Sequence, residues 1–273
     1  MPAKEHYQFP ESHIMDPFRI CGGLYYIGDD DVCAYLLDTG DGLILIDTSW
    51  PTAQALLIHS IWSLGFDPRN VKMILHSHGH FDHFGCTNFI RAISGAKTYL
   101  GWKDAKMFRE QPELALCDDS EPYASAQLFT PDHELHDGDV IRLGNVEISC
   151  VETPGHTEGT ISYFFNLTED GKSYRVGLFG GVGRNTMRKA FYEQYNVSGY
   201  REMFAESIAR MRQETVDIAL GTHTVQASFL KNHKTLQNGA EKNPFIAPDQ
   251  WTAFLDHMEW KLNQLLEDPT EQV

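Results

Sequence analysis

Short runs of apolar residues separated by turn residues dominate the first part of the chain. Runs at 24–28, 32–38, 43–47 and 71–75 are each followed by polar or turn residues, which predicts four β-strands. Residues 52–65 instead carry apolar side chains at helical spacing and end at a glycine, which predicts a helix before the fourth strand. The chain therefore starts with a β-rich unit into which helices are inserted.

A second series of elements repeats this mixture. In chain order, the apolar pattern predicts a helix from about 82 to 94, strands at 146–152, 160–165 and 174–179, a helix at 199–213, a strand at 217–220 and an amphipathic helix at 248–267. We interpret 103–131 as a helix followed by a loop, and 184–198 as a candidate mobile flap. Two packed sheets with helices outside them satisfy this order of elements.

The length and composition are those of a globular protein. The 273 residues are 42% hydrophobic, enough to bury a large core, and we expect a single domain over 1–273. The net charge of −16 repels nucleic-acid phosphates and anionic membrane surfaces. We therefore expect a small-molecule substrate and neither nucleic acid nor a membrane as a partner. The sequence makes no prediction about oligomeric state.

Two further features bear on the compartment. The N-terminal residues contain no apolar stretch of the kind that a secretory signal needs, so we expect a cytoplasmic protein. The cysteines are odd in number, widely spaced and without a Cys-x-x-Cys pair, which predicts reduced, mostly buried thiols. They are Cys21, Cys33, Cys86, Cys117 and Cys150.

The strongest chemical signal follows the predicted strand at 71–75. Four potential metal ligands, His78, His80, Asp82 and His83, lie within six residues. Imidazole and carboxylate groups at this density suit zinc. Residues 78 and 80 point the same way in an extended segment, whereas 82 and 83 lie at a turn into a helix. One short segment can therefore serve two neighbouring metals.

Two more histidines stand at the ends of later strands. His156 follows the strand at 146–152, and His223 follows the strand at 217–220; each lies close to glycine. Either residue alone would more often be a hydrogen-bonded polar residue than a ligand. In a chain that needs further ligands, we interpret both as completing the metal site.

The motifs together resemble those of the metallo-β-lactamase superfamily, over nearly the whole chain. The resemblance rests on the histidine motif at 78–83 and on Asp16–Ile20, Leu43–Thr48, Thr153–His156 and Asn243–Ile246. It implies an α/β fold, a four-layer αββα sandwich with the site where strand ends gather. Within the superfamily the chain looks most like the β-lactamase subclass that binds two zinc ions, and so like enzymes of antibiotic resistance.

Carried over by position, that resemblance assigns the ligands. His78, His80 and His156 would hold the first Zn²⁺, and Asp82, His83 and His223 the second. Asp47 would lie near the site. The chain departs from the family at 180–183, Gly-Gly-Val-Gly, where relatives place Asp, Cys or Ser. We expect Val182, or Gly181 if the register shifts by one, to face the metals, and Val182→Ser to strengthen the second zinc site.

Each proposed zinc keeps an open position, which is typical of a catalytic site. A water activated between two zinc ions would attack the carbonyl of a strained amide or ester, with Asp82 as the catalytic carboxylate that holds it. Arg184 is our candidate for binding a substrate carboxylate, with Arg188 and Lys189 as reserves. The prediction is a di-zinc hydrolase that opens a β-lactam or similar cyclic amide.

Four alternatives differ in the chemistry at the same site. A metabolic hydrolase of a lactone or thioester is the main one, although the missing Asp near 181 counts against it. A flavodiiron-like oxidoreductase would need Glu where His80 stands. A metal-dependent nuclease disagrees with the acidic charge. A non-catalytic binding protein that kept its zinc is disfavoured by the complete set of ligands.

Overall fold

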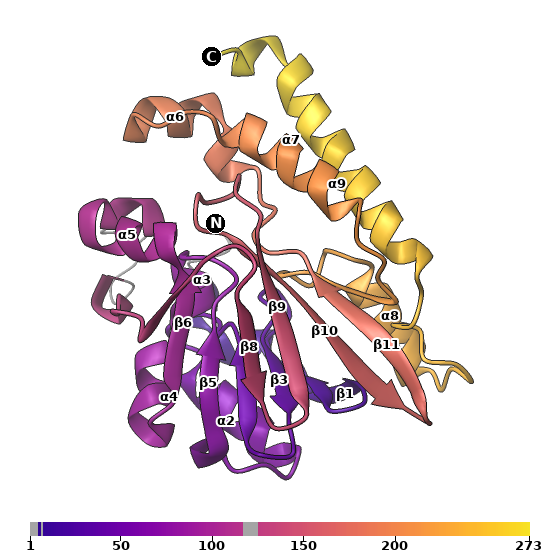
Figure 1. The fold of residues 1–273 in the computed structure, drawn as a ribbon. Coiled ribbons are helices and arrows are strands. Elements are labelled where there is room, and N and C mark those ends of the chain that lie inside the picture. The colour runs from indigo at the N-terminus through magenta and orange to yellow at the C-terminus, as the bar shows by residue number, and fades with distance from the viewer. Residues whose placement is uncertain (1–4, 7, 117–124) are drawn as a thin grey trace.

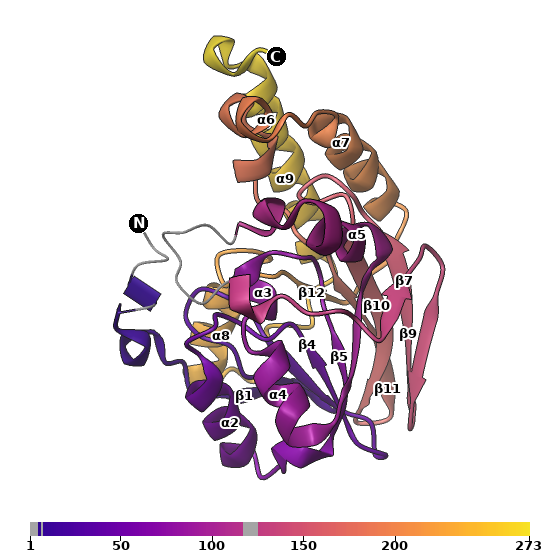
Figure 2. The same cartoon turned by 90° about the vertical axis from the view of Figure 1, so that its left-hand side faces the viewer.

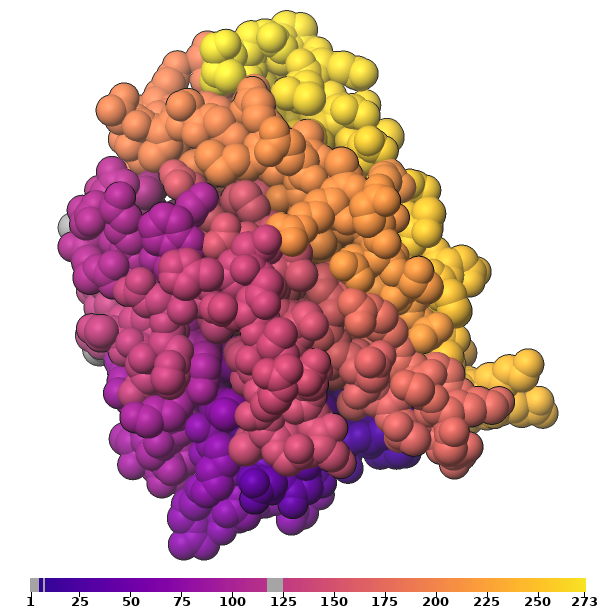
Figure 3. Space-filling model, viewed as in Figure 1, coloured from indigo at the N-terminus to yellow at the C-terminus, as the bar shows by residue number. Residues whose placement is uncertain are grey.

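The computed structural model describes residues 5, 6, 8–116 and 125–273. The chain forms two β-sheets that pack face to face, with helices on both outer sides (Figure 1). Turned by 90°, the structure shows α2 and α4 on one side of the first sheet and the strands of the second sheet on the other (Figure 2). In the space-filling view, the surface of α5 meets that of α6 and α7 near the top of the molecule (Figure 3).

Within the described residues, the first sheet has the order β1-β2-β3-β4-β5-β6-β7. The strands are β1 Phe18–Cys21, β2 Leu24–Tyr26, β3 Tyr35–Asp38, β4 Leu43–Ile46, β5 Val71–Leu75, β6 Lys97–Gly101 and β7 His133–Leu135. The second sheet has the order β12-β11-β10-β9-β8. Its strands are β8 Val140–Leu143, β9 Val146–Glu152, β10 Ile161–Glu169, β11 Lys172–Leu178 and β12 Ile218–Leu220.

The α-helices are α2 Gln54–Ser63, α3 Phe81–Phe84, α4 Thr87–Ser94, α5 Trp102–Glu110, α6 Lys189–Tyr195, α7 Tyr200–Met211, α8 Phe229–Gln237 and α9 Asp249–Glu267. Two short 3-10 helices, η5 Asn185–Met187 and η6 Pro269–Glu271, accompany α6 and α9. Among the described residues, no helix has both the length and the apolar character needed to span a bilayer.

Three apolar clusters separate four layers and explain the unbroken apolar runs of the early strands. Tyr35 and Leu37 of β3 point into the cluster between the sheets, whereas Leu36 points to the cluster under α2 and α4. Successive strand residues face opposite sides, so a strand covered on both sides must be apolar throughout. A third cluster lies between the second sheet and the helices α7 and α9. The predicted αββα sandwich is confirmed.

Strand directions bring several loop starts to one edge. β4, β5 and β6 run parallel, so their C-terminal ends lie side by side. In the second sheet β9 and β11 both run antiparallel to β10, and β12 runs parallel to β11. The loops that follow β4, β5, β6, β9, β11 and β12 carry the chemically interesting residues, as is usual at the carboxyl ends of strands in α/β folds.

Most sequence predictions agree with this arrangement. The strands at 71–75 and 146–152 have the predicted bounds, but the helix expected at 82–94 is divided into α3 and α4. The division falls at Gly85, where a side chain would lie 2.2 Å from the backbone nitrogen of Pro51. The pattern also missed β1, β6, β7, β8 and α8.

Two interpretations of the less regular segments have mixed outcomes. Residues 184–198 form η5 and α6 rather than an irregular flap, because Met187, Phe191 and Tyr192 are buried in the cluster with α7. The helix expected within 103–131 is α5, and the stretch 117–124 lies outside the described residues.

Four predicted thiols are free and buried: Cys21, Cys33, Cys86 and Cys150. Cys117 lies outside the described residues.

Candidate metal centre

The segment after β5 passes through the edge where the strand ends meet. His78, His80 and His83 are almost wholly buried there, and the Asp82 side chain is 15% exposed. His156 enters from the loop after β9, and His223 from the loop after β12. The structure therefore gathers all six residues that the sequence singled out as ligands, and it divides them into two groups of three.

His78, His80 and His156 form the first triad. Their candidate ligand atoms all lie within 4.8 Å of one another. Nδ1 of His80 lies 2.9 Å from Nε2 of His156. Nε2 of His78 is buried and has no hydrogen-bond partner among the described residues. A buried imidazole nitrogen without a partner is costly, and a metal ion that accepts its lone pair would remove that cost.

Asp82, His83 and His223 form the second triad. Nε2 of His83 lies 3.3 Å from Nε2 of His223, and Oδ2 of Asp82 lies 3.5 and 3.7 Å from these two nitrogens. The two triads are neighbours, because the ring centroids of His78 and His83 are 4.1 Å apart. Nitrogen and oxygen donors that converge in threes fit two divalent metals held close together.

Carboxylate groups pair with the Nδ1 atoms of the two histidines in the second triad. Oδ2 of Asp47 lies 3.0 Å from Nδ1 of His83, and the same carboxylate accepts hydrogen bonds from the backbone and hydroxyl of Ser77. Asp47 reaches this position from the end of β4 with a left-handed φ of 58°. Oδ1 of Asp31 lies 3.1 Å from Nδ1 of His223. Carboxylate partners of this kind fix the ring orientation of metal-binding histidines.

Neutral groups pair with the Nδ1 atoms of two histidines in the first triad. Nδ1 of His156 is hydrogen-bonded to the carbonyl oxygen of Gly183 at 2.8 Å, and Nδ1 of His78 to the hydroxyl of Ser77 at 2.9 Å. The sequence pattern did not predict Ser77 in this role. It also missed Asp31, whose only local signal is its place in a run of three aspartates before β3.

The protonation of the histidines differs between the triads. Burial, together with neighbouring histidines, holds the pKa values of His78 and His80 well below their usual range. Burial also lowers the pKa of His156 to about 3, although its bond to Gly183 opposes the shift. Burial lowers the pKa of His83 too, but the charges of Asp82 and Asp47 outweigh it and raise the value to about 9.

The residues after β11 are placed differently from the sequence expectation. Val182 does not face the metal ligands: its side chain is buried in the apolar cluster under α7 and α9. Gly181 faces His156 instead, and a Cβ there would lie 2.2 Å from the imidazole. The first choice, Val182, was wrong, and the stated alternative, Gly181, is the residue that faces the ligand His156. Successive residues of an extended segment face opposite sides, so a one-residue shift reverses the direction.

Arg184 lies beyond this segment and is turned toward α9. Its guanidinium donates a hydrogen bond to the carbonyl oxygen of Lys261 at 2.8 Å. Arg184 also lines an open cavity of about 590 Å³ together with Asn185 and Arg188. The structure therefore brings the six candidate ligands together, whereas the Arg184 guanidinium is hydrogen-bonded to α9.

A third group of possible ligands near the N-terminus, His6, His13 and Asp30, also has its candidate ligand atoms within 4.8 Å of one another, but its rings are oriented differently from those of the triads. The rings of His6 and His13 stack with centroids 3.7 Å apart, and Nδ1 of His13 is already paired with Asp30 at 2.8 Å. Nitrogen lone pairs lie in the ring plane, so stacked imidazoles direct them side by side rather than toward a common point.

Comparison with known proteins agrees with this geometry. The sequence model of the metallo-β-lactamase superfamily matches residues 27–168. The chain is similar to native FEZ-1 metallo-β-lactamase from Legionella gormanii, with a TM-score of 0.83 and 29% identity over 96% of this chain and 98% of that one. It is also similar to LRA-12, a class B3 di-zinc metallo-β-lactamase from an Alaskan soil metagenome, with a TM-score of 0.79 and 27% identity over 93% and 95% of the two chains.

A relative with another activity matches as well. The hydroxyacylglutathione hydrolase GloC of Haemophilus influenzae is 26% identical over 163 residues, which span 59% of this chain and 73% of that protein. This chain is thus similar to proteins that are named for different hydrolytic activities. The family match covers more than half of the chain and includes the segment that supplies five of the six gathered residues. The chain is therefore a member of the metallo-β-lactamase superfamily and a metal-dependent hydrolase.

Proposed function

We propose that this protein is a di-zinc hydrolase that opens the amide bond of a β-lactam or a similar cyclic amide. The observation that carries the proposal is the convergence of six donor atoms in two adjacent triads, with Nε2 of His78 left without a protein partner. The likeness to proteins named as metallo-β-lactamases over almost the full chain supports the choice of substrate class.

The residues present fit two zinc ions. His78, His80 and His156 would hold one, and Asp82, His83 and His223 the other. Zinc bound by three protein ligands supplies an open coordination position, polarises a carbonyl group and lowers the pKa of water. The buried imidazoles at the first triad are neutral at pH 7 because burial lowers their pKa values, so they are ready to act as ligands.

Asp82 is the residue we assign to the proton of the attacking water. Its carboxylate is partly exposed, whereas the histidines at 78, 80 and 83 are buried, so it stands where the centre opens to solvent. One carboxylate oxygen faces His83 and His223. As an acceptor, the carboxylate would orient the water by a hydrogen bond and hold its proton until the leaving nitrogen takes it.

The cavity beside η5 is the place we propose for the substrate carboxylate. Arg184, Arg188 and Asn185 line it, and the preceding residue, Gly183, touches His156 through its carbonyl oxygen. A guanidinium group is well suited to a carboxylate. Arg184 would have to keep or exchange its bond to Lys261 when a substrate carboxylate binds.

A second candidate function is hydrolysis of a thioester, which the likeness to GloC favours. The residues after β11 weigh against it, because Gly180, Gly181 and Val182 offer no side chain that could bridge two metals. The zinc triads would serve either reaction, so only a comparison of substrates distinguishes the two functions.

Zinc analysis combined with a substrate panel tests the proposal. We expect two zinc ions per chain and faster hydrolysis of a chromogenic cephalosporin than of a hydroxyacylglutathione thioester or a simple lactone. Removal of zinc by a chelator should abolish the activity, and added zinc should restore it. A protein that contains both zinc ions and cleaves only the thioester would contradict the cyclic-amide proposal and support the second candidate.

A further inference from the structure

A buried carboxylate on α5 joins the two loops that carry the first triad. Asp104 lies in the first turn of α5 and has no exposed surface. Its Oδ2 accepts hydrogen bonds from the backbone N–H of Gly79 and from the hydroxyl of Thr157, both at 2.7 Å. Its Oδ1 accepts one from the backbone N–H of Gly159 at 2.9 Å.

These partners flank the ligands of the first triad. Gly79 lies between His78 and His80, and Thr157 and Gly159 follow His156. Every ligand of that triad is therefore on a segment that Asp104 holds. The histidines of the second triad are held differently, since Asp47 and Asp31 touch His83 and His223 directly.

The close approach of α5 depends on two glycines. A Cβ at Gly159 would lie 2.3 Å from the backbone nitrogen of Asp104, and one at Gly79 would lie 2.8 Å from the methyl group of Met107. Without side chains at these positions, the helix comes near enough for one carboxylate to reach both loops. The two backbone N–H groups would otherwise be buried without partners.

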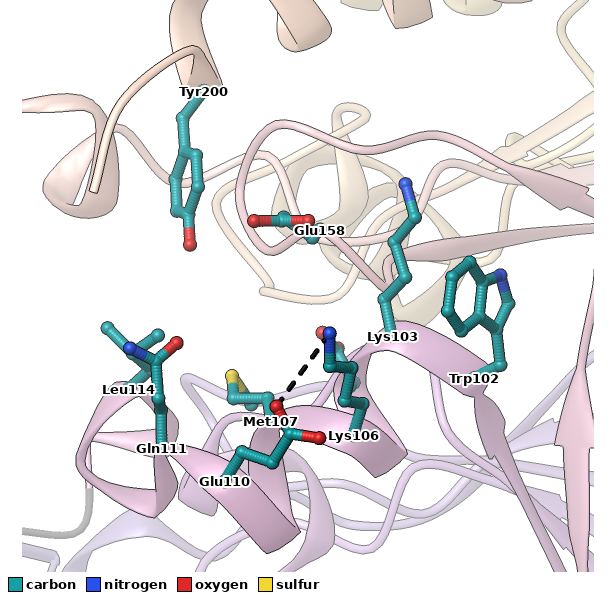
Figure 4. Close-up of a pocket in the computed structure, with 10 residues that line it drawn as sticks. Trp102, Lys103, Lys106, Met107, Glu110, Gln111, Leu114, Glu158 and Tyr200 are labelled. Carbon is teal, nitrogen blue, oxygen red and sulfur yellow. Dashed lines mark ion pairs between the residues drawn. The ribbon is translucent and has the colours of Figure 1, made fainter.

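The carboxylate of Asp104 is compensated by hydrogen bonds rather than by a cation. Among the described residues, no cation forms an ion pair with Asp104. The lysines that flank it, Lys103 and Lys106, line the neighbouring cavity of about 140 Å³, and Lys106 pairs with Glu110 at 3.7 Å (Figure 4). Burial of a carboxylate without a cation carries a desolvation cost, and the hydrogen bonds from the two ligand-bearing loops offset it. Its three hydrogen bonds point to a positioning role.

We propose that Asp104 is the positioning residue of the first metal site, because it fixes the separation between the His78–His80 segment and the His156 loop. The inference rests on the proposed two-metal function for the nature of the ligand. It predicts that loss of the carboxylate weakens the first site and leaves the second site nearly unchanged.

Zinc titrations in two single-site backgrounds test this inference. His223→Ala removes a ligand of the second triad and leaves the first, and His156→Ala does the reverse. We expect Asp104→Ala to weaken zinc binding about tenfold or more in the first background and less than about twofold in the second. Asp104→Asn keeps one acceptor oxygen, so it should cause a smaller loss in the same direction, and it decides the question if the alanine variant does not fold.

Asp132 provides the matched control. Its carboxylate accepts hydrogen bonds from Thr98 and Lys97 at the other end of β6. Asp132→Ala should lower the melting temperature of the metal-free protein without changing either zinc affinity. Equal losses in both backgrounds after Asp104→Ala, or no loss in either, would overturn the inference.

The inference and the proposed function can fail separately. A protein that binds two zinc ions and hydrolyses nothing in the substrate panel would refute the function, while the titrations still test Asp104. Unchanged zinc affinity in the Asp104 variants, in a protein that does hydrolyse a β-lactam, would refute the role of Asp104 alone.

Discussion

Both triads are built mainly from histidines, but different groups hold those histidines in place. The first consists of three imidazoles backed by a hydroxyl and a carbonyl group. The second contains Asp82, and its histidines are backed by Asp47 and Asp31. Burial and backbone contacts therefore shape the first site, whereas negative charge shapes the second. The difference predicts that the sites respond differently to mutation and to pH.

The largest effect should follow loss of a ligand from the first triad. We expect His156→Ala to lower kcat/KM for the best substrate by at least about a hundredfold, because removal of a metal's charge costs several kcal/mol of transition-state stabilisation. Stopped-flow or steady-state kinetics with zinc analysis would measure it. His59→Ala, an exposed histidine on α2, is the control. Unchanged turnover would refute the assignment of the first triad.

Removal of a backing carboxylate should affect one site only. Asp31→Asn should weaken zinc binding at the second triad by roughly ten- to a hundredfold, because the hydrogen bond that orients His223 loses its charge. Zinc affinity in the His156→Ala background reports this, and the first site, measured in the His223→Ala background, should not change. Asp30→Asn is the neighbouring control. Equal losses at both sites would show that the division between the triads is wrong.

The zinc affinities of the two sites should depend differently on pH, because only one site releases a proton when it binds the metal. His83 has a raised pKa of about 9, so it is protonated at pH 7 in the metal-free protein and must lose that proton to bind a metal. Affinity at the second triad should therefore rise about tenfold per pH unit from 7 toward 9 and then level off. The first triad should show no such slope, because its histidines are already neutral. Calorimetry in buffers of different ionisation enthalpy would count the protons.

The smallest effect on metal binding is expected at Val182. Val182→Ser places a hydroxyl among apolar side chains and should lower the free energy of unfolding by about 1–3 kcal/mol. The affinity of the second triad should stay the same, since the side chain does not face it. Denaturant unfolding and a zinc titration would check both. A tighter second site would mean that residue 182 faces the metals after all.

The sequence was informative where structure depends on neighbours along the chain. The histidine motif, the strand before it and the apolar runs of the strands are local patterns. The structure confirms the sandwich expected from the order of elements and from the family resemblance. β7 and β8 were not predicted because they are short and largely exposed, so they lack a buried apolar run.

The residues that support the ligands could not be found in the same way. Asp31 and His223 are 192 positions apart, and Asp104 is 25 and 53 positions from Gly79 and Thr157. No local period marks such partners. The direction of the Val182 side chain could not be predicted for a different reason, since a strand end gives no signal for which of two adjacent residues faces the site.

The ligands of each triad come from both sheets, and this has a consequence for folding. His80 follows β5 of the first sheet, and its partner His156, 76 positions later, follows β9 of the second. His83 and His223 repeat the pattern across 140 positions. A metal at either triad would therefore fasten one half of the sandwich to the other. Zinc would make the halves unfold together, and the strength of that fastening would rise with the concentration of free zinc.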